Sequence, residues 1–317
     1  MSDAVTAFAP GSVGNVGPGL DILGLAVAGD GDAVRAEWLA EPGLRMLDPG
    51  HAELPVEAER HTAGLAARAV LARAGSAVAR GRGIGLTVRK GLPLSGGQGG
   101  SAASAVAGAV AVNALLGEPL GRMALIEACL EAEEAVAGRH ADNIAPALLG
   151  GIVLIRSMDP LDLVQLPVPA ELYVVLARPE QRMRTADARA VLPREIPRAV
   201  ALHQAAQVGA MVAALALDDY ALLARSVDDR IAEPARAGLL PGFAAAKDAA
   251  LGAGALGSSI SGSGPTAFAL ARGRESAERV AAAMAASYRA GGAECRVRVG
   301  PVDRDGATVR RESAAER

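Results

Sequence analysis

The stretch that decides the fold starts at residue 91 and reads Gly91-Leu92-Pro93-Leu94-Ser95-Gly96-Gly97-Gln98-Gly99-Gly100-Ser101-Ala102-Ala103-Ser104, followed by an Ala- and Val-rich run to Leu116. A β-rich segment precedes it at residues 84–88, and the run after it predicts a helix of about four turns. Four glycines in five positions leave this loop almost without Cβ atoms, so backbone N–H groups can approach a ligand closely. The helix start adds unpaired N–H donors and the positive end of the helix dipole. Together these features predict an anion site, for phosphate above all.

Two better-known phosphate motifs fit this loop poorly. The pattern G-x-x-x-x-G-K-[ST] is absent, which excludes the P-loop mechanism with its lysine. Residues 97–102 do fit G-x-G-x-x-A, the dinucleotide fingerprint, but that fingerprint needs a strand after the helix that ends in an acidic residue. Here the helix runs into Gly117-Glu118-Pro119 and then a second helical pattern. From this stretch alone, an ordinary glycine-rich turn before a helix stays open.

Composition narrows the classes of function. The chain has 317 residues, a net charge of −3 and only 2% aromatic residues, which argues against nucleic acid as a partner. Cys129 and Cys295 stand far apart and fit reduced thiols of a cytoplasmic protein, and with four histidines they make a structural zinc site improbable. No signal peptide is visible. The apolar runs 102–117 and 199–217 are expected to be buried helices, with no membrane partner.

Two further glycine-rich segments carry polar side chains. Residues 11–21 read Gly11-Ser12-Val13-Gly14-Asn15-Val16-Gly17-Pro18-Gly19-Leu20-Asp21 and predict an irregular loop after a short strand at 3–9. The alternative for its Asn and Asp is an Asx-turn pair that caps local backbone. Residues 260–266 read Ile260-Ser261-Gly262-Ser263-Gly264-Pro265-Thr266 and lie between two predicted strands. A bulged hairpin would explain this segment locally, whereas a second glycine loop facing the first would complete a phosphate pocket.

Carboxylates follow the central helix. Residues 122–137 have the 3.6-residue spacing of a helix, and Glu133 lies among other acids in it, for which a solvated face is the plain interpretation. Asp142-Asn143 is placed to cap a short helix that runs toward Leu149. Beside a phosphate site, the same pair could instead orient an acceptor hydroxyl.

The remaining pattern predicts two α+β halves that meet near the prolines of residues 155–168. Further helices are expected at 62–74, 186–192, 194–217, 219–228, 243–253 and 275–289. Further strands are expected at 22–28, 33–39, 152–156, 172–177, 258–260, 266–271 and 296–299, with a variable surface connection at 40–60. The charged residues after 303 predict a loose tail.

Three glycine motifs in one chain are more specific than any one of them. They resemble the GHMP kinase superfamily, and the resemblance extends over nearly the whole chain to its members that phosphorylate L-homoserine. The similar segments are Asn15-Val16-Gly17-Pro18-Gly19-Leu20-Asp21, His140-Ala141-Asp142-Asn143-Ile144-Ala145-Pro146, Thr185 to Pro193, Glu233-Pro234-Ala235-Arg236, and the third motif Ser261-Gly262-Ser263-Gly264. The resemblance implies a two-domain α+β fold with an ATP-binding domain like domain 2 of ribosomal protein S5 at 1–160. It also implies a ferredoxin-like domain at 161–305 and a loose tail at 306–317.

The resemblance also implies a reaction and a set of site residues. ATP would phosphorylate L-homoserine on the route to threonine, with Mg²⁺ as cofactor and a homodimer as the family's usual assembly. The ATP phosphates would lie on Pro93, Leu94, Ser95, Gly96, Gly97, Gln98, Gly99, Gly100, Ser101, Ala102 and Ala103, and the metal on Ser101 and Glu133. The substrate would bind Asn15, Asp21, Asn143, Arg189 and Arg236. Asp142 and Asn143 would be the catalytic residues, with Asp142 either the general base or only an orienting group.

The chain departs from the superfamily pattern P-x-x-x-G-L-G-S-S-A-A at two positions. Gln98 stands where leucine is usual, and Gly100 replaces the first serine of the pair. Because a hydroxyl of that pair helps to hold Mg²⁺ in relatives, this chain must use Ser101, water or Glu133. The alternatives are another small-molecule kinase of the superfamily, a catalytically weak binding protein on the same fold, which Gly100 alone favours, and, more distantly, a dinucleotide-dependent oxidoreductase.

Overall fold

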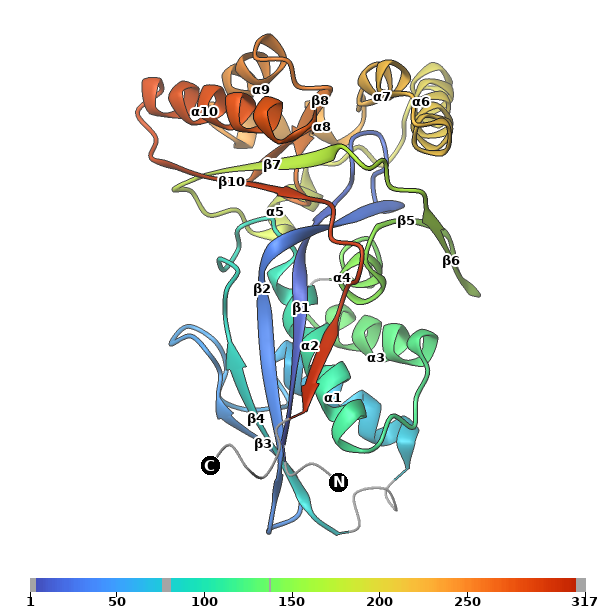
Figure 1. Ribbon diagram of the computed structural model, residues 1–317, viewed down its shortest axis with the longest axis vertical. Helices are drawn as coiled ribbons and strands as arrows, with labels where there is room; N and C mark the ends of the chain where they lie inside the picture. The colour runs from blue at the N-terminus through green and yellow to red at the C-terminus, as the bar shows by residue number, and fades with distance from the viewer. Residues whose placement is uncertain (1–3, 76–80, 137, 312–317) are drawn as a thin grey trace.

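The computed structural model describes residues 4–75, 81–136 and 138–311. Within these ranges the strands form one seven-stranded and one four-stranded sheet, and helices pack against both (Figure 1). This mixed α+β arrangement in two parts confirms the predicted fold class.

The larger sheet belongs to the N-terminal half. Its main strand order is β11-β1-β2-β4-β3. Strand β5 pairs with the first residues of β2, from Leu23 to Leu25, and β6 pairs with β5. The strands are β1 (Ala4–Gly14), β2 (Leu23–Leu39), β3 (Leu44–Asp48), β4 (Gly83–Arg89), β5 (Ile152–Met158), β6 (Leu161–Leu166) and β11 (Thr308–Arg311). The helices α1 (Thr62–Ala74), α2 (Gly100–Leu115), α3 (Arg122–Glu134) and α4 (Ile144–Leu149) gather on one side of this sheet (Figure 1).

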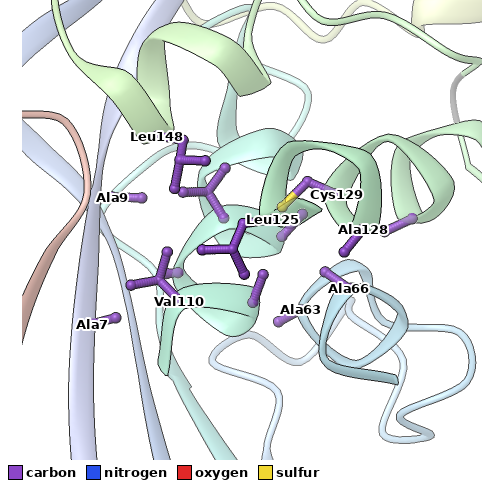
Figure 2. Packing of buried hydrophobic residues seen from close by; sticks show 14 of the residues in the cluster. Ala7, Ala9, Ala63, Ala66, Val110, Leu125, Ala128, Cys129 and Leu148 are labelled. Atoms are coloured by element: carbon purple, nitrogen blue, oxygen red, sulfur yellow. The ribbon is translucent and has the colours of Figure 1, made fainter. Parts of the chain in front are cut away.

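Helix α2 is the centre of the N-terminal core. Every residue from Ala102 to Leu115 is buried, so the helix is apolar on all sides, as a fully enclosed helix must be. Its neighbours present short side chains, among them Ala63 of α1 and Ala128 of α3, which lets the helices approach closely (Figure 2). The predicted burial of this run is confirmed, and it fixes the start of α2 rigidly at the end of the glycine loop.

The smaller sheet belongs to the C-terminal half and has the antiparallel order β10-β7-β9-β8. Its strands are β7 (Leu172–Pro179), β8 (Gly257–Ile260), β9 (Ala267–Arg272) and β10 (Cys295–Pro301). Helices α9 (Phe243–Gly252) and α10 (Arg274–Ala290) cover one face. The other face shares a core with β1, β2 and β5 and with α6 (Arg198–Leu217) and α7 (Tyr220–Ser226). Two short helices, α5 (Thr185–Ala190) and α8 (Ala232–Arg236), complete this half.

Several boundaries differ from the sequence predictions. The strands predicted at 22–28 and 33–39 are one strand, β2, bent where its register with β1 shifts beside Pro10 and Gly11. The connection at 40–60 contains β3, which pairs with β4 in parallel. Strand β6 pairs with β5, so the first sheet extends past the predicted domain boundary at residue 160. The predicted loose tail is wrong for residues 308–311, because β11 pairs with β1; residues 312–317 and Ala137 lie outside the described ranges.

The loop predicted at 11–21 is also partly wrong, because β1 continues to Gly14. Glycine predicts a turn there, but in the structure it allows two segments of the chain to approach closely. A Cβ on Gly14 would lie 2.4 Å from Oδ2 of Asp142 and 2.5 Å from Nδ2 of Asn143. An extended strand of small residues therefore brings the two predicted catalytic side chains against the first motif.

Helix α6 differs from the prediction as well. It is long and apolar enough to span a membrane by length and composition, yet only 22% of its most apolar window is buried. The expectation of a buried helix is therefore wrong. Its buried side chains, Gln204, Met211, Ala214 and Leu215, lie on the face toward the core, whereas Leu202 and Leu217 are exposed.

Candidate active site

The three glycine-rich segments meet at one place between the two halves. The Gly262 N–H donates to the carbonyl oxygen of Gly14 (2.9 Å), and the Ser12 N–H donates to that of Gln98 (3.1 Å). The Ser261 hydroxyl donates to the carbonyl oxygen of Gly97 (2.6 Å). These bonds join the first, central and third motifs directly, so they form one site rather than three separate turns.

A cavity of about 420 Å³ opens at this junction. It is lined by the glycine loop and the start of α2, and by polar side chains from both halves of the chain. The predicted residues that line it include Asn15, Ser101, Glu133, Asp142, Asn143 and Arg236. A cavity of this size and polarity suits a small polar ligand together with phosphate groups.

The glycine loop has the backbone geometry of an anion site. Gly99 is the N-cap of α2 in a left-handed conformation (φ 68°), and no side chain caps the helix start. A Cβ on Gly99 would lie 2.0 Å from the Ser12 hydroxyl oxygen, so only glycine fits here. The first turn of α2 faces the cavity with N–H groups that no side chain satisfies, which makes it a place for phosphate oxygens.

Gln98, the first departure from the superfamily pattern, points away from the cavity. Its side chain is buried, and its amide donates to the Thr266 hydroxyl (3.3 Å), which itself donates to the carbonyl oxygen of Gly96 (2.5 Å). Gln98 therefore ties the loop to the third motif, and its backbone alone contributes to the loop.

The predicted metal residues lie together at the helix start. The Ser101 hydroxyl donates to Oε2 of Glu133 (3.0 Å), and both residues line the cavity. Burial raises the pKa of Glu133, and the Ser101 hydrogen bond acts in the opposite direction. Within the described ranges no group of three or more His, Cys, Asp or Glu side chains could hold a metal by itself. One carboxylate and one hydroxyl beside a phosphate site still fit Mg²⁺, which takes its other ligands from water and phosphate.

The predicted substrate residues form a charged group at the cavity: Asn15, Asn143, Arg189 and Arg236 line it, whereas Asp21 is not a lining residue and reaches it through its bond to Arg189. Nη2 of Arg189 donates to Oδ1 of Asp21 (2.8 Å), and Nδ1 of His140 lies 3.8 Å from the same oxygen. The backbone N–H of Asp21 donates to Oδ1 of Asn15 (2.8 Å). Burial acts to raise the pKa of Asp21, but the Arg189 hydrogen bond and the nearby positive charges outweigh it, so this pKa lies below its usual range. Asp21 is therefore an ionised carboxylate that a guanidinium group already holds in place.

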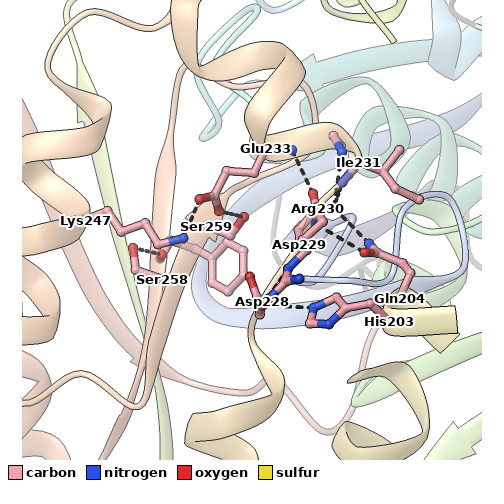
Figure 3. A network of polar contacts seen from close by, with 12 residues as sticks. His203, Gln204, Asp228, Asp229, Arg230, Ile231, Glu233, Lys247, Ser258 and Ser259 are labelled. Atoms are coloured by element: carbon pink, nitrogen blue, oxygen red, sulfur yellow. Dashed lines mark hydrogen bonds and ion pairs between the residues drawn. The ribbon is translucent and has the colours of Figure 1, made fainter. Parts of the chain in front are cut away.

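Arg236 is a buried cation with structural bonds of its own. Its side chain donates to the carbonyl oxygens of Ala188 (Nε, 3.0 Å) and Gly262 (Nη1, 2.9 Å). Helix α8, which carries it, is held at its N-terminus by Asp229, which accepts from three backbone N–H groups. Gln204 of α6 donates to Asp229 (2.8 Å), as Figure 3 shows. The guanidinium group thus has a fixed position at the cavity wall, with donors left over for a ligand.

Asp142 is almost fully buried yet reaches the cavity. Its Oδ2 accepts from the Asn15 N–H (3.0 Å), and its Oδ1 accepts from Nδ2 of Asn143 (3.4 Å). Burial, and secondarily the negative charge of Asp21, raise the pKa of Asp142 to about 7. Asn143 holds the N-cap position of α4, but its side chain makes no capping bond, and the carboxylate of Asp142 accepts from Asn15 and Asn143 instead. The capping alternative is therefore wrong, and a carboxyl group that titrates near neutral pH faces the site.

The predicted site residues did not include several side chains that line the cavity: Lys90, His140, Arg182, Thr185 and Glu53. Glu53 accepts two hydrogen bonds from the Arg182 guanidinium (2.8 and 2.9 Å). Lys90 had a signal, since it precedes the glycine loop directly and the chain has only one other lysine. Arg182 and Glu53 had none, because 129 residues separate them.

Comparison with known proteins agrees with this geometry. The family model described as GHMP kinases N terminal domain matches residues 61–151, and the one described as GHMP kinases C terminal matches residues 211–290. The fold and the three-motif site are those of a kinase of small molecules, and the chain belongs to the GHMP kinases. The predicted resemblance is confirmed.

The most similar proteins narrow the family further. The homoserine kinase of Chlorobaculum tepidum is 41% identical over 90% of this chain and 90% of its own length. That of Arabidopsis thaliana is 42% identical over 90% of this chain and 78% of its own. The crystal structure of homoserine kinase from Cytophaga hutchinsonii superimposes with a TM-score of 0.93 at 42% identity and 98% coverage of both chains. Within the GHMP kinases, the chain therefore belongs to the homoserine kinase family. A mevalonate kinase from L. major, at 18% identity and a TM-score of 0.70, shares the fold alone.

Proposed function

We propose that this chain is an ATP-dependent phosphotransferase that converts L-homoserine into O-phospho-L-homoserine, a step of threonine biosynthesis. The observation that carries the proposal is the cavity itself, where a glycine loop open to phosphate faces two guanidinium groups, one of which is bonded to the carboxylate of Asp21. The relatives of about 40% identity are homoserine kinases over nearly their whole lengths, which supports the same substrate.

Homoserine carries a carboxylate and an ammonium group, and the site offers a partner for each. Arg189 and Arg236 suit the carboxylate, because a guanidinium group can bind both of its oxygens. Asp21 suits the ammonium, and Asn15 and Asn143 direct polar groups of the amino acid. Asp21 and Arg189 form an ion pair before the substrate binds. The substrate ammonium would share or replace the partner of Asp21, and the substrate carboxylate that of Arg189, so both side chains would keep an opposite charge beside them.

The phosphoryl transfer itself needs positioning and charge neutralisation more than covalent chemistry. The backbone from Pro93 to Ala103 and the start of α2 would hold the phosphates of ATP. Ser101 and Glu133 would hold Mg²⁺, which when bound neutralises charge on the phosphate oxygens. Asp142, with its pKa near 7, would accept the proton of the homoserine hydroxyl, and Asn143 would orient that hydroxyl.

The missing serine at position 100 gives a direct prediction about the metal. A Cβ on Gly100 would lie 3.5 Å from its nearest neighbours, in ordinary contact, so Gly100→Ser should fold normally. If Ser101 already supplies the hydroxyl ligand, the Mg²⁺ concentration for half-maximal activity should change by less than about threefold, under 1 kcal/mol. Ser101→Ala should raise it by about tenfold or more. A gain of tenfold or more in Mg²⁺ affinity in Gly100→Ser would show instead that Ser101 alone is a poor ligand.

The function is tested with an assay that detects ADP, comparing homoserine, mevalonate and no acceptor. We expect turnover with homoserine only, because mevalonate has a carboxylate but no ammonium for Asp21. Turnover with mevalonate would point to a different kinase of the superfamily, and no turnover with any acceptor would point to a binding protein.

We also propose that the protein is a cytoplasmic homodimer. The exposed apolar residues of α6, with Leu202 and Leu217 at opposite ends, support an association surface on that flank. Sedimentation checks the homodimer: the wild type should be a dimer and Leu202→Glu a monomer. A wild type that sediments as a monomer would contradict the proposal.

A further inference from the structure

A buried ion pair lies beneath the start of α2. Lys90, directly after β4, pairs with Asp32 of β2, and their side chains are 7% and 0% exposed. The Lys90 ammonium also donates to the Ser104 hydroxyl oxygen (3.0 Å) and to the carbonyl oxygen of Gly100 (3.1 Å). Its three N–H bonds therefore have three acceptors, which is what a buried ammonium needs.

Asp32 holds the opposite end of the same loop. Its Oδ1 accepts from the backbone N–H groups of Gly91 (3.1 Å) and Leu92 (3.2 Å), and its Oδ2 accepts from the Ser104 hydroxyl (2.6 Å). One ion pair thus fixes the first residues of the glycine loop through Asp32 and the last through Lys90. The middle of the loop is held by the first and third motifs, through the carbonyl oxygens of Gly96, Gly97 and Gln98. The ion pair therefore holds the two ends of the loop, which those bonds do not reach.

Lys90 also lines the cavity at the helix start. The arginines that line the cavity, at positions 182, 189 and 236, come from the C-terminal half, so Lys90 is the cation on the loop side. Residue 100, at the end of the glycine loop, has no side chain that could stand between the Lys90 ammonium and the backbone there. A Cβ at that position would lie 3.5 Å from Nζ of Lys90.

We propose that Lys90 is a positioning residue for ATP, which together with Asp32 and Ser104 holds both ends of the glycine loop in the shape that binds phosphate. The proposal rests on the proposed function, since it assigns ATP to this loop. It concerns nucleotide affinity and not the homoserine end of the cavity, where Lys90 makes no contact among those described.

The test is direct ATP binding by Lys90→Met, with the KM of homoserine measured beside it. We expect the Kd of ATP to rise at least tenfold and the homoserine KM to stay within about twofold, because only the loop loses its anchor. Lys90→Arg should recover part of the affinity. An unchanged Kd for ATP, or equal increases in both constants, would overturn the proposal.

The chain offers a matched control in its only other lysine. Lys247 pairs with Glu233 in the C-terminal half, away from the glycine loop. Lys247→Met should lower the melting temperature but leave the Kd of ATP unchanged. With ¹⁵N-labelled lysine, the ammonium signal of Lys90 should shift when ATP is added and that of Lys247 should not. A Lys90 signal that ignores ATP would count against the proposal.

Asp32 would be left as an uncompensated buried charge in Lys90→Met, so this variant could fail to fold. The variant Ser104→Ala then tests the proposal, because it removes one hydrogen-bond acceptor of the Lys90 ammonium and keeps the ion pair of Lys90 with Asp32. A rise of about threefold or more in the Kd of ATP supports the proposal, and wild-type affinity overturns it. Wild-type protein that binds no ATP, or binds it without phosphorylating homoserine, would instead contradict the proposed function.

Discussion

Asp142→Asn is expected to lower kcat by about 10²- to 10⁴-fold, the usual contribution of a general base. The wild-type rate should rise with pH through about 7, where the Asp142 carboxyl loses its proton, and the residual rate of the variant should lose this dependence. Steady-state kinetics from pH 5.5 to about 8.5 measure both effects. Turnover within a few-fold of wild type would show that Asp142 only orients Asn143.

The same substitution should make the protein more stable at high pH. Because burial raises the folded-state pKa of Asp142 above its ordinary value of 3.8, the folded state binds more protons than the unfolded state between about pH 4 and 7. The stability that this group contributes is therefore full below pH 4 and is lost as the pH rises through 7. An uncharged amide avoids that loss, so Asp142→Asn should gain about 1 kcal/mol or more at pH 8 relative to pH 5.

Denaturant unfolding of wild type and variant at the two pH values checks the sign. Asp218→Asn is a matched control: this carboxylate is exposed at the end of α6 in a left-handed conformation that asparagine tolerates. It should change neither turnover nor the pH dependence of stability. If the stability of Asp142→Asn relative to wild type is no greater at pH 8 than at pH 5, the native carboxyl is not destabilised by burial.

Arg236→Leu is expected to raise the KM of homoserine by about 10- to 100-fold, because a charge-assisted bond to the substrate carboxylate is worth roughly 1.5–3 kcal/mol. The KM of ATP should stay within about threefold. Arg236→Lys keeps the charge, but its compact ammonium group cannot reproduce the separate positions of Nε and Nη1 and also bind both oxygens of the substrate carboxylate. It should therefore fall between wild type and Arg236→Leu.

The structure adds a second consequence to this substitution. The carbonyl oxygen of Ala188 would lose its side-chain donor, at a cost of about 1–3 kcal/mol, so the variant should also melt earlier. The carbonyl oxygen of Gly262 would keep one donor, Nδ2 of Asn15 (3.0 Å). Arg272→Leu, which removes an exposed ion pair with Glu171, is the control and should leave both KM values unchanged. Equal increases in both KM values for Arg236→Leu would mean that the third motif had shifted, and that Arg236 does not select homoserine.

The sequence predicted elements well where one local pattern decides the structure. Helix α1 has the predicted ends, and α2 is buried from Ala102 to Leu115 because its Ala- and Val-rich run leaves no charged face. The sequence prediction was wrong where one residue type serves two structural roles. Glycine at position 14 predicts a turn, whereas Gly14 lies in a strand that must approach Asp142 closely. Strand β11 was missed because its partner, β1, pairs with it across at least 300 residues, as from Phe8 to Thr308.

For the site, residue type and spacing predict the chemistry of each motif but not how the motifs are placed relative to one another. The glycine loop of residues 91–100 indicated phosphate by itself, since glycine and a helix start are local features. What holds that loop could not be predicted: Asp32 and Lys90 are 58 residues apart, and either would pass for a surface charge in the sequence. The near-neutral pKa of Asp142 and the bond between Asp21 and Arg189 likewise depend on burial and on contacts between the two halves. Burial and long-range charge pairs exist only in the folded chain, so the sequence determined which groups are present, and the tertiary structure decided how each is charged and where it points.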